Sequence, residues 1–247
     1  MLLSSKAIVL KSFPYSNTSI ISRLYTEDYG KVSVMAKCAR RPKNPLASTL
    51  EPLNGIHVNY FSKESRGLQN LKEANSLYIV KNIREDMHSL TTGLTILDIL
   101  DHTCIEQDPS PILYRLVTKC VNVLEENPGL YKEIFWFFML QLAIRSGFKP
   151  NLDRCGGCLC TMSECVLDIH TGMLSCRNCI SIGDNDLNSP QLQVLKKLNV
   201  THINNLSNIE LSDKLSNGIT QFLLSFLKIH MLGMEKVKSL KIMDQLL

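Results

Sequence analysis

The chain has 247 residues, enough for two ordinary domains, and its 45% hydrophobic and 20% charged content is typical of a soluble globular protein. No basic leader precedes an apolar run at the start, and the most apolar stretch, residues 134–140, is too short to cross a bilayer, so we expect neither export nor a membrane span. The net charge of +4 is uneven, because residues 1–80 carry eleven Lys/Arg against five acidic residues; this bias favours a polyanion partner over lysines scattered on a solvated surface.

The first part of the chain has the pattern of short strands. Five segments rich in β-branched residues are separated by turn-forming residues, at 7–10, 19–25, 31–35, 56–61 and 68–78. Five strands without a long helix predict a small closed barrel of the oligonucleotide/oligosaccharide-binding (OB) type, although an SH3-like barrel fits the number of strands nearly as well.

From about residue 81 the hydrophobic period becomes helical. Ser89 is placed to cap a first helix, and Asp108, which precedes a proline, is placed to cap a second one that ends at Asn127. A third helix is predicted over residues 131–145, with Gly147 closing its C-terminus. The sequence therefore predicts an all-α domain after the barrel.

The third helix is apolar around nearly its whole circumference, so we expect it at the centre of a helical bundle. A second interpretation is that some of its aromatic residues, beside Arg145, line a groove for an apolar, acidic peptide. Further helices are predicted from Ser189 and over residues 209–232.

Two cysteine pairs with the spacing of a zinc ribbon interrupt the helical part. Each pair has two intervening residues, seventeen residues separate the pairs, and nine cysteines in a chain without an export signal favour metal binding over disulfides. Four sulfur ligands leave no open position on the metal, so we expect one structural Zn²⁺ rather than a catalytic one. The predicted ligands are Cys155, Cys158, Cys176 and Cys179. Cys160 and Cys165 lie between the pairs and offer alternative sulfurs.

Positive charges cluster directly after the third predicted strand. Lys37, Arg40, Arg41 and Lys43 fall within seven residues, on a loop suited to a phosphate backbone. Arg23 and Arg66 join the candidate DNA contacts on charge alone. Four aromatic residues of the barrel are candidates for base stacking, and each also fits the barrel core or rim: Tyr15, Tyr25, Tyr60 and Phe61.

Motifs of catalysis are missing from the sequence. It contains no phosphate-binding Gly-rich loop, no dinucleotide fingerprint, no His-x-Glu of the zinc deaminases and no Gly-x-Ser-x-Gly. We therefore expect a protein that is not an enzyme. A redox role of the Cys-x-x-Cys pairs is a weaker alternative, which predicts reversible oxidation without bound metal.

Several short segments, in this order and spacing, resemble the bacterial DNA repair and recombination mediators of the RecO family. The segments are Ala7-Ile-Val-Leu-Lys11, Leu24-Tyr-Thr-Glu-Asp-Tyr-Gly-Lys31, Lys37-Cys-Ala-Arg-Arg41, Leu50-Glu-Pro-Leu53, Gly147-Phe-Lys-Pro150 and Leu232-Gly-Met-Glu-Lys-Val-Lys-Ser-Leu240. The resemblance covers essentially the whole chain. It departs at Cys38, where that family usually has glycine, and some members lack the cysteines.

The resemblance implies an α+β protein with an N-terminal OB barrel (1–80) and a helical domain (81–247) that carries a four-cysteine zinc ribbon at 152–182. It implies binding of single- and double-stranded DNA, annealing of complementary strands, and loading of RecA together with RecR on DNA coated by single-stranded DNA-binding protein. It implies a pocket in the helical domain for the C-terminal tail of that coat protein, without assigning its residues. By motif match, Lys37, Arg40 and Arg41 are the implied DNA contacts.

The expected location is the bacterial cytoplasm, in association with the nucleoid during repair. The alternative function, from a different class, is a zinc-ribbon adaptor that binds RNA or protein in transcription or ribosome assembly.

Overall fold

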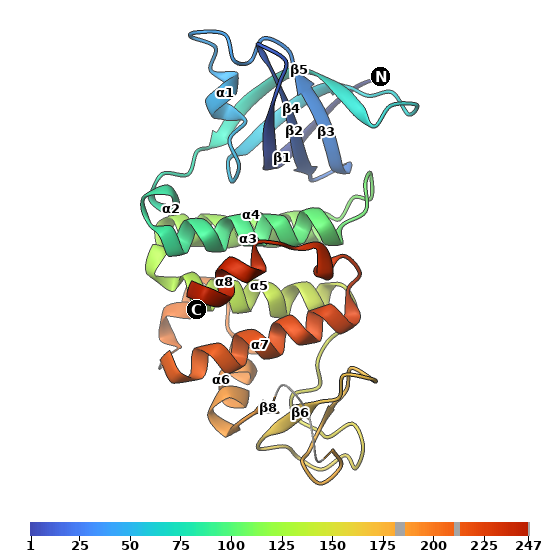
Figure 1. Ribbon diagram of the computed structural model, residues 1–247, viewed down its shortest axis with the longest axis vertical. Helices are drawn as coiled ribbons and strands as arrows, with labels where there is room; N and C mark the ends of the chain where they lie inside the picture. Colours follow the sequence, from blue (N-terminus) through green and yellow to red (C-terminus); the bar gives the residue numbers. More distant parts are fainter. Residues whose placement is uncertain (181–185, 210–212, 247) are drawn as a thin grey trace.

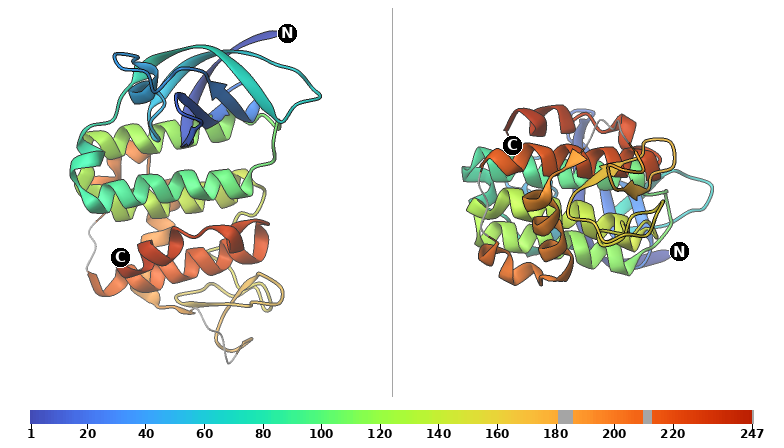
Figure 2. Two further views of the ribbon diagram at one scale, coloured as in Figure 1. Left: turned by 45° about the horizontal axis from the view of Figure 1, so that its top comes forward. Right: turned by 90° about the horizontal axis from the view of Figure 1, so that it is seen from below.

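In the computed structural model of the chain, which describes residues 1–180, 186–209 and 213–246, the elements stack in layers along one long axis (Figure 1). A β-barrel lies at one end, against α3 (Met87–Thr103) and α4 (Pro111–Glu126). Beyond these helices lie α5 (Tyr131–Arg145) and α7 (Asp213–His230), and a cysteine-rich segment occupies the opposite end (Figure 2).

The barrel is closed by five strands in the order β1-β2-β3-β5-β4. The strands are β1 (Leu2–Tyr15), β2 (Ser19–Thr26), β3 (Gly30–Ala36), β4 (Gly55–Phe61) and β5 (Leu68–Tyr78). All neighbours are antiparallel except β3 and β5, whose parallel pairing closes the barrel. The predicted fold, an OB-type barrel followed by helices, is confirmed. A short helix, α1 (Leu46–Thr49), joins β3 to β4 and was not predicted.

The barrel has its own apolar core because alternate residues of each strand point inward. Val9, Leu24, Val34 and Val58 are completely buried there. Outward-facing Tyr25 is buried too, but it belongs to the apolar cluster of the helical domain. The barrel is therefore packed on the helices through one part of its outer surface.

A glycine fixes the contact between barrel and helices. Gly30 has φ +67°, and a Cβ added there would lie 2.6 Å from the carbonyl carbon of Asp108. Only glycine allows this approach of the β2–β3 turn to the backbone of the α3–α4 loop. The loop is also bound to β3, because the N–H of Gln107 donates to the carbonyl of Lys31 over 3.1 Å.

Two helices have caps that differ from the predicted ones. The cap of α3 is Asp86, whose carboxylate accepts the N–H of Ser89, so Ser89 lies inside the first turn. The cap of α4 is Ser110, not Asp108, with Pro111 in the first turn. Both corrections have the same cause: several small polar residues precede each helix, and only the backbone conformation decides which of them accepts the bond.

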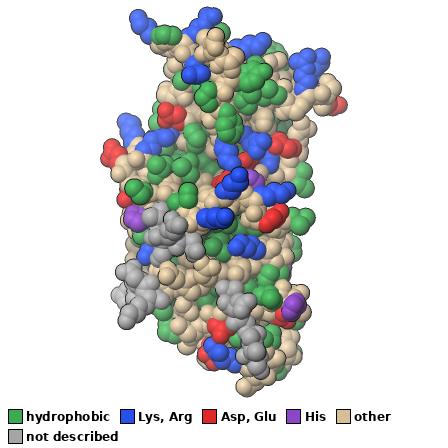
Figure 3. All heavy atoms as spheres, in the orientation of Figure 1, with side chains coloured by type: hydrophobic (Ala, Val, Ile, Leu, Met, Phe, Trp, Pro, Cys, Tyr) green, Lys and Arg blue, Asp and Glu red, His purple; other side chains and the backbone are tan. Residues whose placement is uncertain are grey.

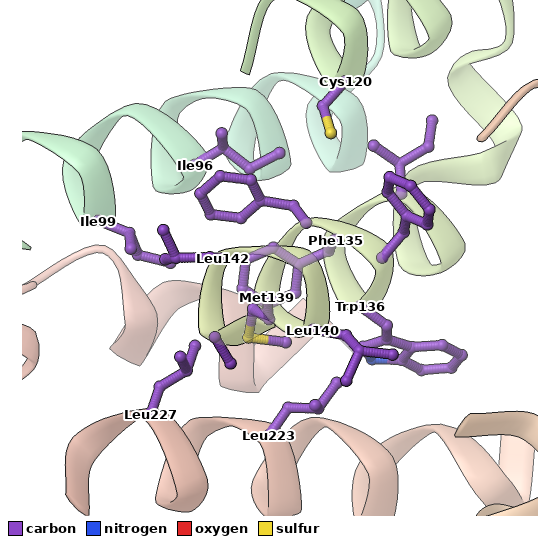
Figure 4. Packing of buried hydrophobic residues seen from close by; sticks show 14 of the residues in the cluster. Ile96, Ile99, Cys120, Phe135, Trp136, Met139, Leu140, Leu142, Leu223 and Leu227 are labelled. Atoms are coloured by element: carbon purple, nitrogen blue, oxygen red, sulfur yellow. The ribbon is translucent and has the colours of Figure 1, made fainter. Parts of the chain in front are cut away.

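The third helix agrees with its prediction. Helix α5 spans Tyr131–Arg145, and Gly147 follows with φ +91°. Phe135, Trp136 and Phe138 are all fully buried, because other helices surround α5 (Figure 4). The indole N–H of Trp136 donates to the hydroxyl of Thr220 over 2.8 Å, which satisfies its one buried polar atom.

The cysteine-rich segment carries a small antiparallel sheet of the order β7-β6-β8. Its strands are β6 (Cys165–Leu167), β7 (Leu174–Ser175) and β8 (Asp186–Leu187). Helix α6 (Ser189–Val200) starts where predicted, and a capping box between Asn188 and Gln191 defines its first turn.

The last part of the chain is more broken than predicted. Residues 210–212 of the long helix predicted over 209–232 lie outside the described residues, and α7 ends at His230. After it come a turn at Met234–Lys236 and α8 (Leu240–Leu246), which was not predicted. The remaining short elements are α2 (Asn82–Glu85) and 3₁₀ turns at Pro128–Leu130 and Ile203–Asn208. Within the described ranges, none of the helices is long and apolar enough to cross a membrane.

Candidate nucleic-acid interface and metal centre

The basic loop, residues 37–43, leaves the barrel directly after β3 and has a defined backbone. The N–H of Arg40 donates to the carbonyl of Thr18 over 2.8 Å, and the N–H of Arg41 donates to the carbonyl of Cys38 over 3.1 Å. Cys38 has φ +59°, a left-handed conformation that glycine adopts without strain. The backbone thus keeps the glycine-like turn although the residue is cysteine, at a cost of about 1 kcal/mol.

The charges of the basic loop are available to a ligand. Lys37, Arg40, Arg41 and Lys43 are exposed. Within the described part of the chain no carboxylate forms an ion pair with any of the four. The Arg40 guanidinium makes one weak bond, of 3.4 Å, to the carbonyl of Ser16. Arg66, in the β4–β5 hairpin, is also exposed and without a described acidic partner.

Arg23 has a different environment from the other candidate DNA contacts. Its guanidinium donates to both carboxylate oxygens of Asp101, on α3, over 3.0 and 2.9 Å. Lys11 joins the same cluster through Asp98, at 2.7 Å, and Lys31 donates to the backbone carbonyl of Asp101. The acidic partners lie far away in the sequence, so charge counting within the barrel did not find them.

Of the four candidate stacking residues, the structure exposes two. Tyr25 and Tyr60 are buried, and burial raises the pKa of Tyr60 to about 12. Tyr15 and Phe61 stay about half exposed. Sequence reasoning missed Phe13, which is 51% exposed on β1, two residues before Tyr15. The signal that could have found it is the spacing of two, which places both rings on one face of a strand.

The cysteine pairs converge on one point. The sulfur atoms of Cys155, Cys158, Cys160 and Cys176 lie within 4.8 Å of one another. The Sγ atoms of Cys158 and Cys176 are 3.7 Å apart. Ligands at a Zn–S distance of about 2.3 Å occupy the corners of a tetrahedron about 3.8 Å on edge. The donor set therefore fits a structural zinc ion.

The backbone around the cluster favours thiolates. Hydrogen bonds from the backbone N–H groups of Cys158, Cys176 and Gly157 lower the pKa of the Cys155 thiol to about 5. A hydrogen bond from the backbone N–H of Cys160 lowers the pKa of Cys158 as well. Thiolates are the form in which cysteine binds a metal, so the turn geometry prepares the ligands.

A fifth sulfur makes the ligand set ambiguous. Cys179 lies beside Gly157, where an added Cβ would be 3.1 Å from its sulfur and 3.8 Å from that of Cys155. The group of sulfurs within 4.8 Å of one another contains Cys160 and leaves out Cys179, so these two cysteines compete for the fourth ligand position. Cys165, the other alternative sulfur, is buried in β6, and burial raises the pKa of its thiol to about 12. Cys165 is therefore part of the apolar core.

A basic pocket of about 400 Å³ lies on the helical domain. It opens between α4, α5 and residues 200–203, and it combines apolar with cationic side chains. Its apolar lining includes Phe137, and its cationic lining includes Arg115, Lys119 and Arg145. The sequence interpretation that placed a groove beside Arg145 has a matching cavity here.

These features define a class of protein: a small OB-type barrel with unpaired cations on its loops, within the described residues, carried by a helical domain with a cysteine cluster. Two family models match the chain, "Recombination protein O N terminal" over residues 1–80 and "Recombination protein O C terminal" over residues 84–241. The chain belongs to the RecO family.

Curated relatives agree with this family. The chain is similar to the "DNA repair protein RecO" of Salinibacter ruber, with 37% identity over 61% of this chain and 58% of the relative. It is also similar to the proteins of that name from Prosthecochloris aestuarii, with 28% identity over 63% and 59%, and Thermodesulfovibrio yellowstonii, with 27% identity over 89% and 90% of the two chains. The alignments with the first two span less than two thirds of those relatives' length.

Proposed function

We propose that this protein is a recombination mediator of bacterial DNA repair, which binds single- and double-stranded DNA and anneals complementary strands in the cytoplasm. The observation that carries the proposal is the basic loop, whose exposed cations have no acidic partner within the described residues. Unpaired surface cations bind a phosphate backbone with little loss of hydration, and the gain comes from released counterions.

The proposed phosphate contacts are Lys37, Arg40, Arg41, Lys43 and Arg66. Such contacts carry no base information, so binding is expected to be largely independent of sequence and strongly dependent on salt. DNA contact by Arg23 stays a prediction, because a phosphate would share the guanidinium with Asp101. Annealing breaks and forms no covalent bond; it requires only neutralisation of two anionic strands, so the proposed role needs no catalytic residue.

The basic pocket is the proposed site for the acidic C-terminal tail of single-stranded DNA-binding protein. Phe137 offers apolar surface, and Arg115, Lys119 and Arg145 offer positive charge for acidic side chains. Holding the coat protein by its tail would bring the barrel to coated DNA. Together with RecR, the protein would then help to load RecA.

We also propose the functional units 1–80 for DNA and 81–247 for the partner, with the ribbon of 152–182 as a structural insertion. One Zn²⁺ would be held by Cys155, Cys158, Cys176 and Cys179, and it would supply no chemistry beyond fixing the ribbon. Metal-coupled folding of this kind stabilises small peptides by about 10 kcal/mol or more.

The decisive experiment reverses two charges of the basic loop. In the full chain, Arg40→Glu with Arg41→Glu should weaken both single-strand and duplex binding at low salt and reduce the slope of log affinity against log salt by about 2. Lys228→Glu with Lys238→Glu, at exposed positions of the helical domain, makes the same change in net charge and should leave both unchanged. Unchanged affinity of the double variant, with the fold intact by circular dichroism, would remove the proposed DNA surface.

A further inference from the structure

The outer face of β1, β2 and β3 is covered over one half only. Near the helical domain, Tyr25 and Lys31 are buried by α3, α4 and the loop between them. Farther from the helices, a row of apolar residues runs across the same face, because Phe13 pairs with Ile21 and Ile21 pairs with Met35. Neighbours in register point to the same side of a sheet, so the three side chains form one strip.

Tyr15, two residues after Phe13 on the same face of β1, extends this strip, and both aromatic rings face solvent. Phe13 is 51% and Tyr15 is 49% exposed, and within the described residues neither packs against another aromatic ring. Ile21 and Met35 are partly exposed beside them. A large exposed apolar strip on a barrel indicates an interaction surface rather than a folding requirement.

The strip is bordered by the basic loop. The N–H of Arg40 is bound to Thr18 and its guanidinium to Ser16, which fixes Arg40 beside the turn that follows Tyr15. Lys37 follows directly after the end of β3 that carries Met35. In Figure 3, patches of hydrophobic side chains are visible on the barrel face turned toward the viewer, between other side chains and backbone, and Lys and Arg side chains lie around its upper edge.

We propose that Phe13 and Tyr15 stack on unpaired bases of single-stranded DNA while Lys37 and Arg40 bind its phosphates. This inference rests on the proposed function and names the strand form that the barrel face prefers. Charge complementarity selects the occupant: exposed rings bordered by exposed cations fit a chain that alternates flat bases with anionic groups. A purely apolar surface of a partner protein would form no ion pairs with these cations.

The stacking face gives the barrel a means of releasing its product. In a duplex the faces of the bases are hidden by their neighbours, so only the phosphates remain available to the loop. A single strand uses both rings and cations, whereas the annealed duplex keeps only the cations. Annealing therefore lowers the affinity of this barrel face for the bound DNA. The duplex does not occupy the two rings, so they can bind the next single strand.

The test removes the rings and keeps the apolar volume. Phe13→Leu with Tyr15→Leu should lower single-strand affinity by about tenfold per ring, equal to about 1.4 kcal/mol each, while duplex affinity changes less than about twofold. Tyr15→Phe keeps the ring and should bind as the parent does. Phe148→Leu, an exposed aromatic of the helical domain, is the positional control. An abasic strand, with phosphates but no bases, should bind the parent and the double variant equally.

A fluorescent reporter gives an independent readout. The chain's single tryptophan, Trp136, is completely buried, so Phe13→Trp adds one responsive indole. Single-stranded DNA should quench it, and an abasic strand should not. Equal losses on single-strand and duplex DNA, or none on single-strand DNA, overturn the inference. The loop variants Arg40→Glu and Arg41→Glu test the proposed function separately. If they weaken DNA binding while the ring variants do not, only the stacking inference is wrong. If they leave DNA binding unchanged, the proposed function is wrong.

Discussion

The guanidinium of Arg23, on β2, binds both carboxylate oxygens of Asp101, on α3, across the junction of the barrel and the helices. The Asp101 side chain is only 1% exposed, whereas that of Arg23 is 38% exposed. Lys11 and Lys31 lie within 4 Å of the same carboxylate. One buried carboxylate therefore lies within 4 Å of cations from three strands. Ion pairs, in addition to apolar packing, fix the position of the barrel on the helices.

Loss of the Asp101 carboxylate should weaken this junction. Asp101→Asn leaves three cations facing a neutral group, so we expect the free energy of unfolding to fall by about 2–3 kcal/mol. Urea denaturation at neutral pH measures it. Glu106→Gln is the control, since that carboxylate is 52% exposed and 3.7 Å from Lys31, and it should cost under about 1 kcal/mol. Equal effects of the two variants would contradict a special role of Asp101.

Arg23→Gln separates the two roles open to this residue. We expect lower thermal stability, because the Asp101 carboxylate loses the Nη1 donor that bonds to both of its oxygens. A loss of DNA affinity as large as that of Arg40→Gln, at equal folded fraction, would support direct contact with DNA as well. Stability equal to that of the parent chain would contradict the structural role.

The junction should also respond to acid. Burial acts to raise the pKa of Asp98, but hydrogen bonds from Lys11 and Ser239 outweigh it and hold the pKa below the ordinary value of 3.8. A carboxyl with a lower pKa in the folded state stabilises fully above its unfolded pKa, and this stabilisation disappears as the pH falls through the folded pKa. We expect stability to decrease below about pH 4 and to decrease less in Asp98→Asn. The measurement is the free energy of unfolding as a function of pH between about 3 and 6. An equal decrease in the parent chain and in Asp98→Asn would contradict this prediction.

Metal analysis should find one zinc ion per chain. Cys155→Ser removes the buried sulfur to which several backbone N–H groups point, and we expect it to abolish binding and to destabilise the ribbon. Cys160→Ser and Cys179→Ser decide between the two candidate fourth ligands. The proposed set predicts metal retention in the first variant and loss in the second. The reverse result would assign Cys160 instead.

The basic pocket should bind a peptide that carries both acidic and apolar residues. Arg145→Glu should reduce the affinity by at least about tenfold, because the charge at the pocket wall is reversed. Fluorescence anisotropy with a labelled peptide measures it, and DNA binding by the barrel should remain. Lys228→Glu serves again as a charge-matched control. Peptide affinity unaffected by Arg145→Glu would exclude this pocket as the tail site.

Local patterns were sufficient for most elements. The five strands and the helix of residues 131–145 follow from alternation, helical period and turn residues. The structure has each of them, but β1 runs from Leu2 to Tyr15 where only residues 7–10 were predicted. The cap positions were wrong because Asp86 and Ser110 compete with nearby polar residues for the same role. Helix α8 was missed because only its packing on α3 stabilises so short a segment.

Features that depend on distant residues could not be predicted. The Arg23–Asp101 pair joins residues 78 positions apart, and no local pattern connects them. The spacing of two places Phe13 on the same strand face as Tyr15, but its exposure depends on where the helices cover the barrel, which the spacing does not reveal. Spacing identified the cysteine pairs, but the approach of Cys160 to the other sulfurs results from the turn between them.

The barrel is closed by its shortest seam. Only Ser33–Met35 of β3 pair with β5, whereas β1 and β2 pair along most of their length. Amide protons at this seam should exchange with solvent earlier than those of the long antiparallel ladders. The basic loop follows one side of the seam and the hairpin of Arg66 precedes the other. Local opening of this seam would change the distance between the basic loop and the hairpin of Arg66. The barrel could then accept DNA of different widths between these two cationic segments.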